Sequence, residues 1–132
     1  MEIIEYQTYH EEEIILLYAS VGWTAYTDAP DALQRGFDKS LLTLATYDGD
    51  TLIGLIRAVG DGETIVLVQN LLVFPQYQRR GIGTALMRAM MDRFANVRQF
   101  QLVTDDTEKT IAFYRSLGLR DLSVLGCRNF MR

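Results

Sequence analysis

The sequence predicts an α+β domain built on a mixed, mostly antiparallel β-sheet with helices on both of its faces. Two β-rich runs, Ser40–Tyr47 and Thr51–Val59, are joined by Asp48-Gly49-Asp50, which is a strong hairpin signal. A third run, Thr64–Phe74, follows a second turn at Asp61-Gly62, so these runs form an antiparallel meander. Helical patterns precede and follow the meander, and the order β-α-α-β-β-β-α-β-α-β is typical of a sheet covered by helices.

A short strand and two helices are expected before the meander. Thr8 and Glu11 fit a capping box at the start of the first helix, and Gly22 fits its end. Pro30 suits the first turn of the second helix. The expected elements are a strand at Ile3–Gln7, a helix at Glu12–Val21, an irregular segment at Trp23–Thr27 and a helix from Asp28 to about Lys39.

Helices and strands alternate after the meander. Pro75 cannot donate a ladder hydrogen bond, so it ends or deflects the third strand. The next strand follows a helix and should therefore run parallel to the third strand if both lie in one sheet. The expected elements are helices at Gly83–Ala95 and Thr107–Leu117, a strand at Gln99–Thr104, and one or two closing strands within Leu119–Met131.

The length and charge are those of one soluble domain spanning residues 1–132, large enough to bury its own core. The net charge of −4 argues against a nucleic-acid binder, whose surface would be basic. The single cysteine excludes an internal disulfide and fits a reducing cytoplasm. The start of the chain, Met1–Glu5, lacks a signal-peptide pattern, and no apolar run approaches the ~18 residues of a membrane span. A cytoplasmic location without a membrane partner is expected.

The stretch Val73–Thr84 carries the clearest signal for ligand binding. It reads Val-Phe-Pro-Gln-Tyr-Gln-Arg-Arg-Gly-Ile-Gly-Thr and joins the third strand to a helix. Its glycines let the backbone approach a ligand closely, and the first amides of the helix lack intrahelical partners at the positive end of its dipole. Because Arg79 and Arg80 flank these amides, the stretch is typical of a site for a phosphate-bearing ligand.

Two other phosphate-binding motifs do not fit this stretch. A P-loop requires Gly-x-x-x-x-Gly-Lys-Ser/Thr, a string that the chain does not contain. A dinucleotide-binding fingerprint requires a third glycine, and Leu86 stands in its place. The phosphate-bearing ligand is therefore expected to be held in another way.

Gln78-Arg79-Arg80-Gly81-Ile82-Gly83 resembles the Gln/Arg-x-x-Gly-x-Gly/Ala signature with which the GNAT superfamily of N-acetyltransferases binds acyl-CoA. A second stretch, Thr110–Leu119, looks like the Ala-Phe-Tyr helix and following Leu-Gly-Phe near the end of many members. The order of elements is also similar to that family's fold over essentially the whole chain. The resemblance implies acetyl-CoA as co-substrate, no metal, and transfer of acetyl to a primary amine.

The resemblance also implies roles for individual residues. Tyr114 matches the tyrosine that serves as general acid toward the departing CoA thiolate. Leu71–Val73 matches a strand end whose backbone pairs with the pantetheine arm, in a slot where two strands splay apart, often at a bulge. An amide there also polarises the thioester carbonyl, a contribution of ~3 kcal/mol in other enzymes. The implied cofactor-binding residues are Leu71, Leu72, Val73, Gln78, Arg79, Arg80, Gly81, Ile82, Gly83, Thr84, Thr107 and Phe113.

The chain departs from the family pattern in two places. Thr107 stands where many members carry an asparagine that contacts the pantetheine arm. Residues 66–70, Val-Leu-Val-Gln-Asn, contain no acid where many members carry a glutamate that acts as base through water. A lysine-like amine with a pKa of ~10.4 is mostly protonated near neutral pH, so a base is useful. Asp105, Asp106 or water is the candidate base, although both aspartates are better interpreted as helix caps.

Other side chains have a plain structural interpretation beside a functional one. Trp23 and Tyr26 lie where the family places substrate-binding walls, and they serve equally well as core aromatics. Arg57, within an apolar strand, is costly to bury unpaired, so it faces solvent or meets an acidic partner or the substrate. His10 is expected at the surface, and Cys127 is expected to be buried.

The sequence therefore predicts an N-acetyltransferase that acts by direct attack of an amine on acetyl-CoA, with a small-molecule amine favoured as acceptor. The segment at Gly22-Trp23 and the turn Val59–Gly62 loosely resemble members acting on arylalkylamines and polyamines. Two alternatives stay open, acetylation of a protein amine and a non-catalytic CoA-binding regulatory module. Family members are often dimers, so a homodimer is compatible with the resemblance.

Overall fold

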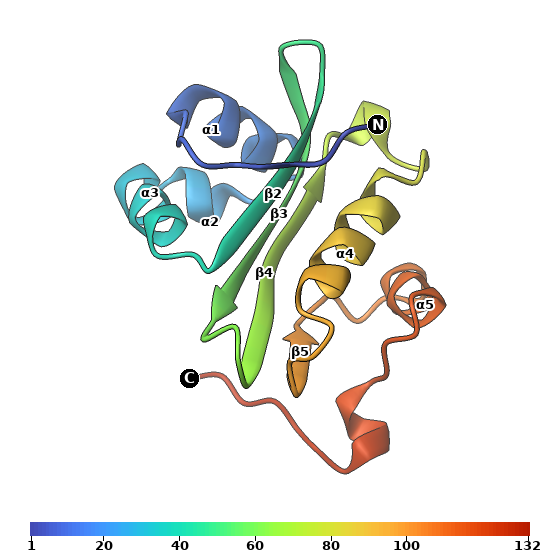
Figure 1. The fold of residues 1–132 in the computed structure, drawn as a ribbon. Coiled ribbons are helices and arrows are strands. Elements are labelled where there is room, and N and C mark those ends of the chain that lie inside the picture. Colours follow the sequence, from blue (N-terminus) through green and yellow to red (C-terminus); the bar gives the residue numbers. More distant parts are fainter.

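A five-stranded sheet forms the centre of the computed structural model, which describes residues 1–132, and its strands follow one another in the order β1-β2-β3-β4-β5 (Figure 1). Neighbouring strands from β1 to β4 are antiparallel, and β5 runs parallel to β4. The parallel pairing of β4 and β5, which a helix connects, confirms the sequence prediction. The strands are β1 Ile4–Glu5, β2 Leu42–Asp48, β3 Thr51–Gly60, β4 Ile65–Val73 and β5 Gln99–Leu102.

Helices cover both faces of this sheet, which confirms the predicted α+β class (Figure 1). The first three helices lie on one face, and the last two lie on the other. Two short 3₁₀ turns, Pro75–Tyr77 and Leu122–Leu125, complete the regular structure. The helices are α1 Glu11–Ser20, α2 Thr24–Thr27, α3 Pro30–Asp38, α4 Ile82–Arg93 and α5 Glu108–Ser116. None of them is long and apolar enough to span a membrane.

The core consists of two apolar clusters, one on each face of the sheet. Successive side chains of a strand point to opposite faces, so Leu55 of β3 packs with α1 and α3 while Ile56 packs with α4. β3 lies in the middle of the sheet and is buried from Leu52 to Ala58. Burial on both faces explains why this strand is continuously apolar instead of alternating.

Helix α4 packs closely against β3 at Gly54. A methyl group at this glycine would lie 3.0 Å from Cγ2 of Ile82 and 3.2 Å from Cδ1 of Leu86. Both contacts are tighter than most side-chain contacts, so a larger residue at Gly54 would push these α4 side chains outward from the sheet. Gly54 therefore helps to fix where the N-terminus of α4 lies.

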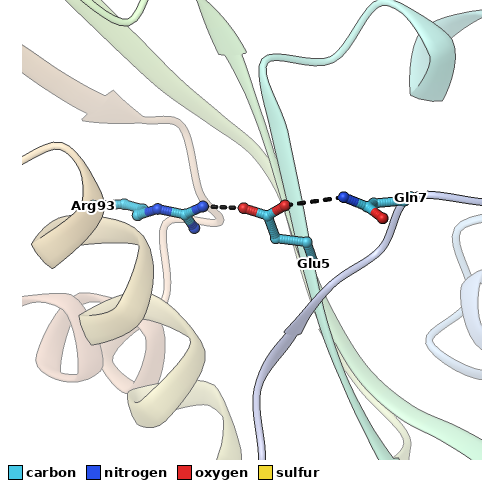
Figure 2. Close-up of polar contacts among 3 residues, drawn as sticks. All are labelled: Glu5, Gln7 and Arg93. Atoms are coloured by element: carbon cyan, nitrogen blue, oxygen red, sulfur yellow. Dashed lines mark hydrogen bonds and ion pairs between the residues drawn. The ribbon is translucent and has the colours of Figure 1, made fainter.

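The short strand β1 is tied to the far end of α4 by a surface ion pair. Figure 2 shows the Arg93 guanidinium, from the last turn of α4, pointing at the Glu5 carboxylate. The other carboxylate oxygen of Glu5 accepts a hydrogen bond of 3.2 Å from the Gln7 side chain. Both partners of the ion pair are solvent-exposed, so the pair contributes little stability by itself.

Two local predictions in the N-terminal half were wrong. Thr8 does not cap α1, because His10 occupies the N-cap position without a side-chain hydrogen bond. The His10 amide donates instead to the hydroxyl of Tyr6 at 3.1 Å, so that tyrosine replaces the predicted capping box. The segment predicted to be irregular contains the single-turn helix α2, Thr24–Thr27.

The predicted closing strands do not form after α5. The chain makes a 3₁₀ turn at Leu122–Leu125, in which the Asp121 carboxylate accepts from the Ser123 amide, and Gly126 then takes a left-handed conformation with φ 76°. No residue after α5 joins the sheet. Cys127, expected to be buried, is exposed, and His10 is exposed as predicted.

Candidate active site

The sheet opens between β4 and β5 halfway along β4. Strand β5 pairs only with the first part of β4, from Ile65 opposite Gln99 to Val68 opposite Leu102. Residues 69–73 of β4 therefore have no β5 neighbour. The ladder between β3 and β4 also shifts there, because Arg57 pairs with Asn70 and Ala58 with Val68, which leaves Gln69 as a bulged residue. The bulge and the missing pairing leave a free backbone edge beside Leu71, Leu72 and Val73.

Two left-handed residues shape the turn that follows this edge. Arg79 has φ 65° and Gly81, the N-cap of α4, has φ 81°. Gly81 is followed directly by helical Ile82, and such an alternation aims successive backbone N–H groups at one point. The amides of Ile82, Gly83 and Thr84 open the helix and so lack intrahelical partners, and no side chain caps them. The exposed side chains of Arg79 and Arg80 add positive charge to this end of the helix.

The two glycines of the turn have different surroundings. Around Gly81 a methyl group would meet nothing within 4 Å, so its left-handed conformation is what requires glycine. Gly83 is helical, and a methyl group there would lie 3.6 Å from the Phe113 ring and 4.0 Å from Val73, which are ordinary contacts. The fold alone therefore does not demand a glycine at Gly83.

The tip of the β2–β3 hairpin holds the turn from the other side. The Tyr77 hydroxyl donates to the Asp48 carboxylate at 2.5 Å, and the Arg80 guanidinium lies 5.2 Å from the centre of the Tyr77 ring. The Asp48 hydrogen bond raises the pKa of Tyr77. The Gln78 side chain donates to the Val73 carbonyl at 3.0 Å, which joins the turn to the end of β4.

Phe113 and Tyr114 of α5 lie next to the opening. Their rings meet edge to face with centroids 4.9 Å apart, and both pack against the core on the α4 side of the sheet. Burial, and to a lesser extent the nearby Asp105 charge, raises the pKa of Tyr114. The tyrosine is therefore protonated at neutral pH, as a general acid must be.

The residues before α5 differ from their expected roles. Thr107 is the N-cap of α5, and its hydroxyl accepts a hydrogen bond from the Thr110 amide. The prediction that Asp105 and Asp106 cap this helix was therefore wrong, although both aspartates are exposed near its start. Thr107 is the cap because it lies one position before the first helical residue, where a short side chain can accept a hydrogen bond from the first turn.

Arg57 is buried without an acidic partner, contrary to both structural expectations for it. Its side chain is 6% exposed, and no carboxylate lies within 4.0 Å of it. The guanidinium instead donates to the Asn70 side chain at 2.9 Å. It also donates to the Gly36 carbonyl of α3 and to the hydroxyl of Ser40, just beyond α3. It also lies 5.2 Å from the centre of the Phe37 ring. Neutral groups and an aromatic ring thus surround a permanent charge.

Trp23 and Tyr26 belong to an aromatic cluster on the same face. Their ring centroids are 6.0 Å apart, and both rings contact buried Tyr18. The Tyr26 hydroxyl accepts hydrogen bonds from the side-chain amides of Asn70 at 3.0 Å and Gln69 at 3.2 Å. This pair of contacts connects the aromatic cluster to the bulge where the sheet opens.

Four residues of this region were missed by sequence reasoning, namely Gln69, Asn70, Tyr77 and Asp48. A signal for the first two was present, because Gln69-Asn70 interrupts the apolar run Ile65–Phe74 with two amides. No pattern in the sequence pairs Tyr77 with Asp48, which lie 29 residues apart.

Comparison with known proteins identifies the family to which this chain belongs. Residues 6–119 match the acetyltransferase (GNAT) family, and the chain belongs to that family. A solved GNAT-family acetyltransferase, protein SP0256 of Streptococcus pneumoniae TIGR4, is 39% identical with a TM-score of 0.90, over 99% of this chain and 96% of that chain.

Two further relatives widen the comparison. An uncharacterized ycf52-like N-acetyltransferase of Prochlorococcus marinus is 27% identical over 80% of this chain, and the match spans 60% of the length of that relative. An aminoglycoside 6'-N-acetyltransferase solved with coenzyme A has 20% identity and a TM-score of 0.75, over 89% of this chain and 84% of that chain. At this identity the second likeness concerns the fold alone.

Proposed function

We propose that this protein transfers the acetyl group of acetyl-CoA to the primary amine of a small molecule by direct attack. The observation that carries this proposal is an uncapped helix N-terminus, flanked by two arginines, beside a β-strand with a free backbone edge. A pyrophosphate suits the first feature and an amide-containing pantetheine arm suits the second. The coenzyme A bound to the aminoglycoside acetyltransferase of the same fold supports the same donor.

The residues of the turn fit the phosphate end of this donor. The amides of Ile82, Gly83 and Thr84 have no competing side-chain cap, and Arg79 and Arg80 are exposed beside them. The stack of Arg80 on Tyr77 and the hydrogen bond from Tyr77 to Asp48 hold the turn before a ligand arrives. A preorganised site of this kind loses less entropy on binding.

The end of β4 fits the remainder of the donor. Leu71 and Val73 face the α4 side, where Phe113 and Tyr114 also lie, and Leu72 faces the opposite core. Backbone groups along this free edge bind the pantetheine amides, and an N–H among them stabilises the developing charge on the carbonyl oxygen. Thr107 is engaged as a helix cap, so we assign the pantetheine contacts to β4 and Phe113 in preference to Thr107.

Tyr114 supplies the proton in this scheme. The neutral amine nitrogen attacks the thioester carbon, the new C–N bond forms and the C–S bond breaks. The departing thiolate takes the Tyr114 hydroxyl proton, and the one proton lost by the amine nitrogen returns through solvent to the tyrosinate, which restores Tyr114. No acid occupies β4, so water, one of the exposed aspartates Asp105 and Asp106, or a low acceptor pKa replaces a base on that strand.

The proposal is tested by incubating the protein with acetyl-CoA and a panel of primary amines, with thiol release as the readout. We expect turnover with at least one small amine. Calorimetry with acetyl-CoA provides the second readout, and we expect binding that Gly81→Asp and Gly83→Asp abolish. Binding without thiol release on any small amine or peptide would favour a non-catalytic CoA-binding module, and turnover confined to peptide amines would favour a protein acceptor. Absence of binding would refute both.

A further inference from the structure

The hydrogen-bond directions around Tyr26 are fixed by buried Arg57. An arginine side chain has donors and no acceptor, so the Asn70 atom that it contacts must be the amide oxygen. The Tyr18 hydroxyl donates to the same oxygen at 2.9 Å. The nitrogen of the Asn70 amide must then face Tyr26, to which it donates at 3.0 Å. Arg57 thereby removes the usual ambiguity of an asparagine orientation.

A consequence follows for the hydroxyl of Tyr26. Its oxygen accepts from Asn70 and also from the Gln69 amide, which together use the acceptor capacity of a hydroxyl. The hydroxyl proton is therefore the only part of this group free to form another hydrogen bond, and no protein group accepts it. All bonds in the chain from Arg57 through Asn70 to Tyr26 run in one direction, and such chains strengthen their terminal donor.

The position of this donor relates it to the reaction. The bulge at Gln69 places Gln69 and Asn70 on the same face, so both amides reach Tyr26 where β4 loses its β5 neighbour. Tyr26 and partly exposed Trp23 line the face opposite α4, whose N-terminus is assigned to the donor. The Tyr26 hydroxyl therefore lies on this face, at the point where the free edge of β4 begins.

The local charge selects the kind of group that the hydroxyl binds. Arg57 lies one hydrogen-bonded residue behind Tyr26, and no Asp or Glu pairs with it. A fixed positive charge without a counterion favours an anion nearby and disfavours a second cation. The groups that contact the Tyr26 oxygen are neutral amides, so the site offers no carboxylate there for an ammonium group.

We infer that the acceptor is an amine that carries a carboxylate, of the amino-acid class, and that Tyr26 donates a hydrogen bond to that carboxylate. Arg57 and Asn70 act as positioning residues that orient the donor. The inference rests on the proposed function and specifies its acceptor.

Matched acceptors test this inference. Each set contains an amino acid, its carboxamide and its decarboxylated amine, for example phenylalanine, phenylalaninamide and phenethylamine, and leucine with its two counterparts. We expect the wild-type kcat/KM for the amino acid to exceed that for the decarboxylated amine by at least about tenfold, the effect of one hydrogen bond to a charged group. A preference for the decarboxylated amines would overturn the inference while leaving the proposed acetyltransferase function intact.

Variants test whether the preference for amino acids depends on the Tyr26 hydroxyl. Tyr26→Phe keeps the ring, and we expect it to reduce the ratio of the two kcat/KM values by at least about tenfold, mainly through KM of the amino acid. Tyr47→Phe removes another part-buried hydroxyl on this face, far along the sheet in β2, and should leave the ratio unchanged. An equal loss of activity on both members of a pair in Tyr26→Phe would refute the assigned contact.

A binding measurement keeps the test independent of turnover. With CoA present, an N-acetylated amino acid should raise the melting temperature of the wild type more than the N-acetylated decarboxylated amine does, and Tyr26→Phe should remove this difference. Arg57→Lys retains the charge but not the planar fork, so we expect a ratio between those of wild type and Tyr26→Phe. Equal shifts for both products in the wild type would contradict a carboxylate contact.

Discussion

At Gly83 neither the fold nor the family signature requires a glycine. A methyl group at this helical residue meets only ordinary contacts, and alanine is preferred over glycine within a helix by roughly 1 kcal/mol. Gly83→Ala should therefore leave the free energy of unfolding unchanged or raise it by up to that amount. The family signature also admits alanine at this position, and the methyl group points at Phe113 and Val73, so acetyl-CoA affinity should change by less than about threefold.

Gly81 provides the comparison for this experiment. Its left-handed conformation costs an alanine roughly 1–2 kcal/mol, so Gly81→Ala should lower both stability and affinity. Chemical denaturation and calorimetry on the two variants measure the two effects separately. If Gly81→Ala binds acetyl-CoA as tightly as the wild type, the amides of this turn do not hold the pyrophosphate.

Tyr114 should control the chemical step. Tyr114→Phe retains the ring contact with Phe113, so folding should be preserved, while kcat should fall by about 100-fold or more. Burial raises the pKa of Tyr114, so its proton stays available to a higher pH than that of an ordinary tyrosine. The wild-type rate should therefore not decline below about pH 10 because of this group. A pH–rate profile with a loss centred well below that value would assign the proton to another residue.

At the scale of elements, Glu13 of α1 joins the N-terminal segment to β2. Its Oε2 atom accepts hydrogen bonds from the Tyr6 hydroxyl at 2.7 Å and the Tyr47 hydroxyl at 2.8 Å. Burial, followed by these hydrogen bonds, raises the pKa of both tyrosines in the folded protein. The folded state thus favours the neutral hydroxyls, and the resulting stability is complete below the unfolded pKa of about 10 and is lost as pH rises above it.

This linkage predicts a steep alkaline loss of stability. The melting temperature should change little between about pH 7 and about pH 9 through these groups, and should fall above about pH 10. Tyr47→Phe should make the fall shallower, because one fewer raised pKa remains. Thermal unfolding followed by circular dichroism measures both curves, and identical slopes for wild type and variant would contradict the assignment.

The elements differ in how well their sequences predict them. The meander was predictable because Asp48-Gly49-Asp50 and Asp61-Gly62 are strong turn signals between long apolar runs. The C-terminal strands were wrongly predicted because Leu119–Met131 contains β-forming residues, although nothing on the sheet edge holds them. The predicted cap of α1 was wrong because the hydroxyl of Tyr6, four residues before His10, accepts the N-cap amide in place of a Glu11 side chain.

At the scale of the whole molecule, the sequence predicted the sheet, its two helical faces and the turn before α4. It did so because these features depend on local periodicity and on glycine positions. The Arg57–Asn70–Tyr26 chain was not predictable, since its three members come from β3, β4 and α2 and meet only through the register of the sheet. The roles of Tyr114 and of the turn stay predictions until activity is measured.

The brief pairing between β4 and β5 has a consequence for hydrogen exchange. Four residue pairs hold β5 at the edge of the sheet, whereas β3 is paired along its length on both sides. Amides of β5 should therefore exchange with deuterium well before those of β3, because short edge strands open locally at low free energy. If acetyl-CoA spans the opening, it should slow exchange in β5 and along residues 71–73 while leaving α1 unaffected. The strand beside the donor slot would then be ordered fully only when the donor is bound.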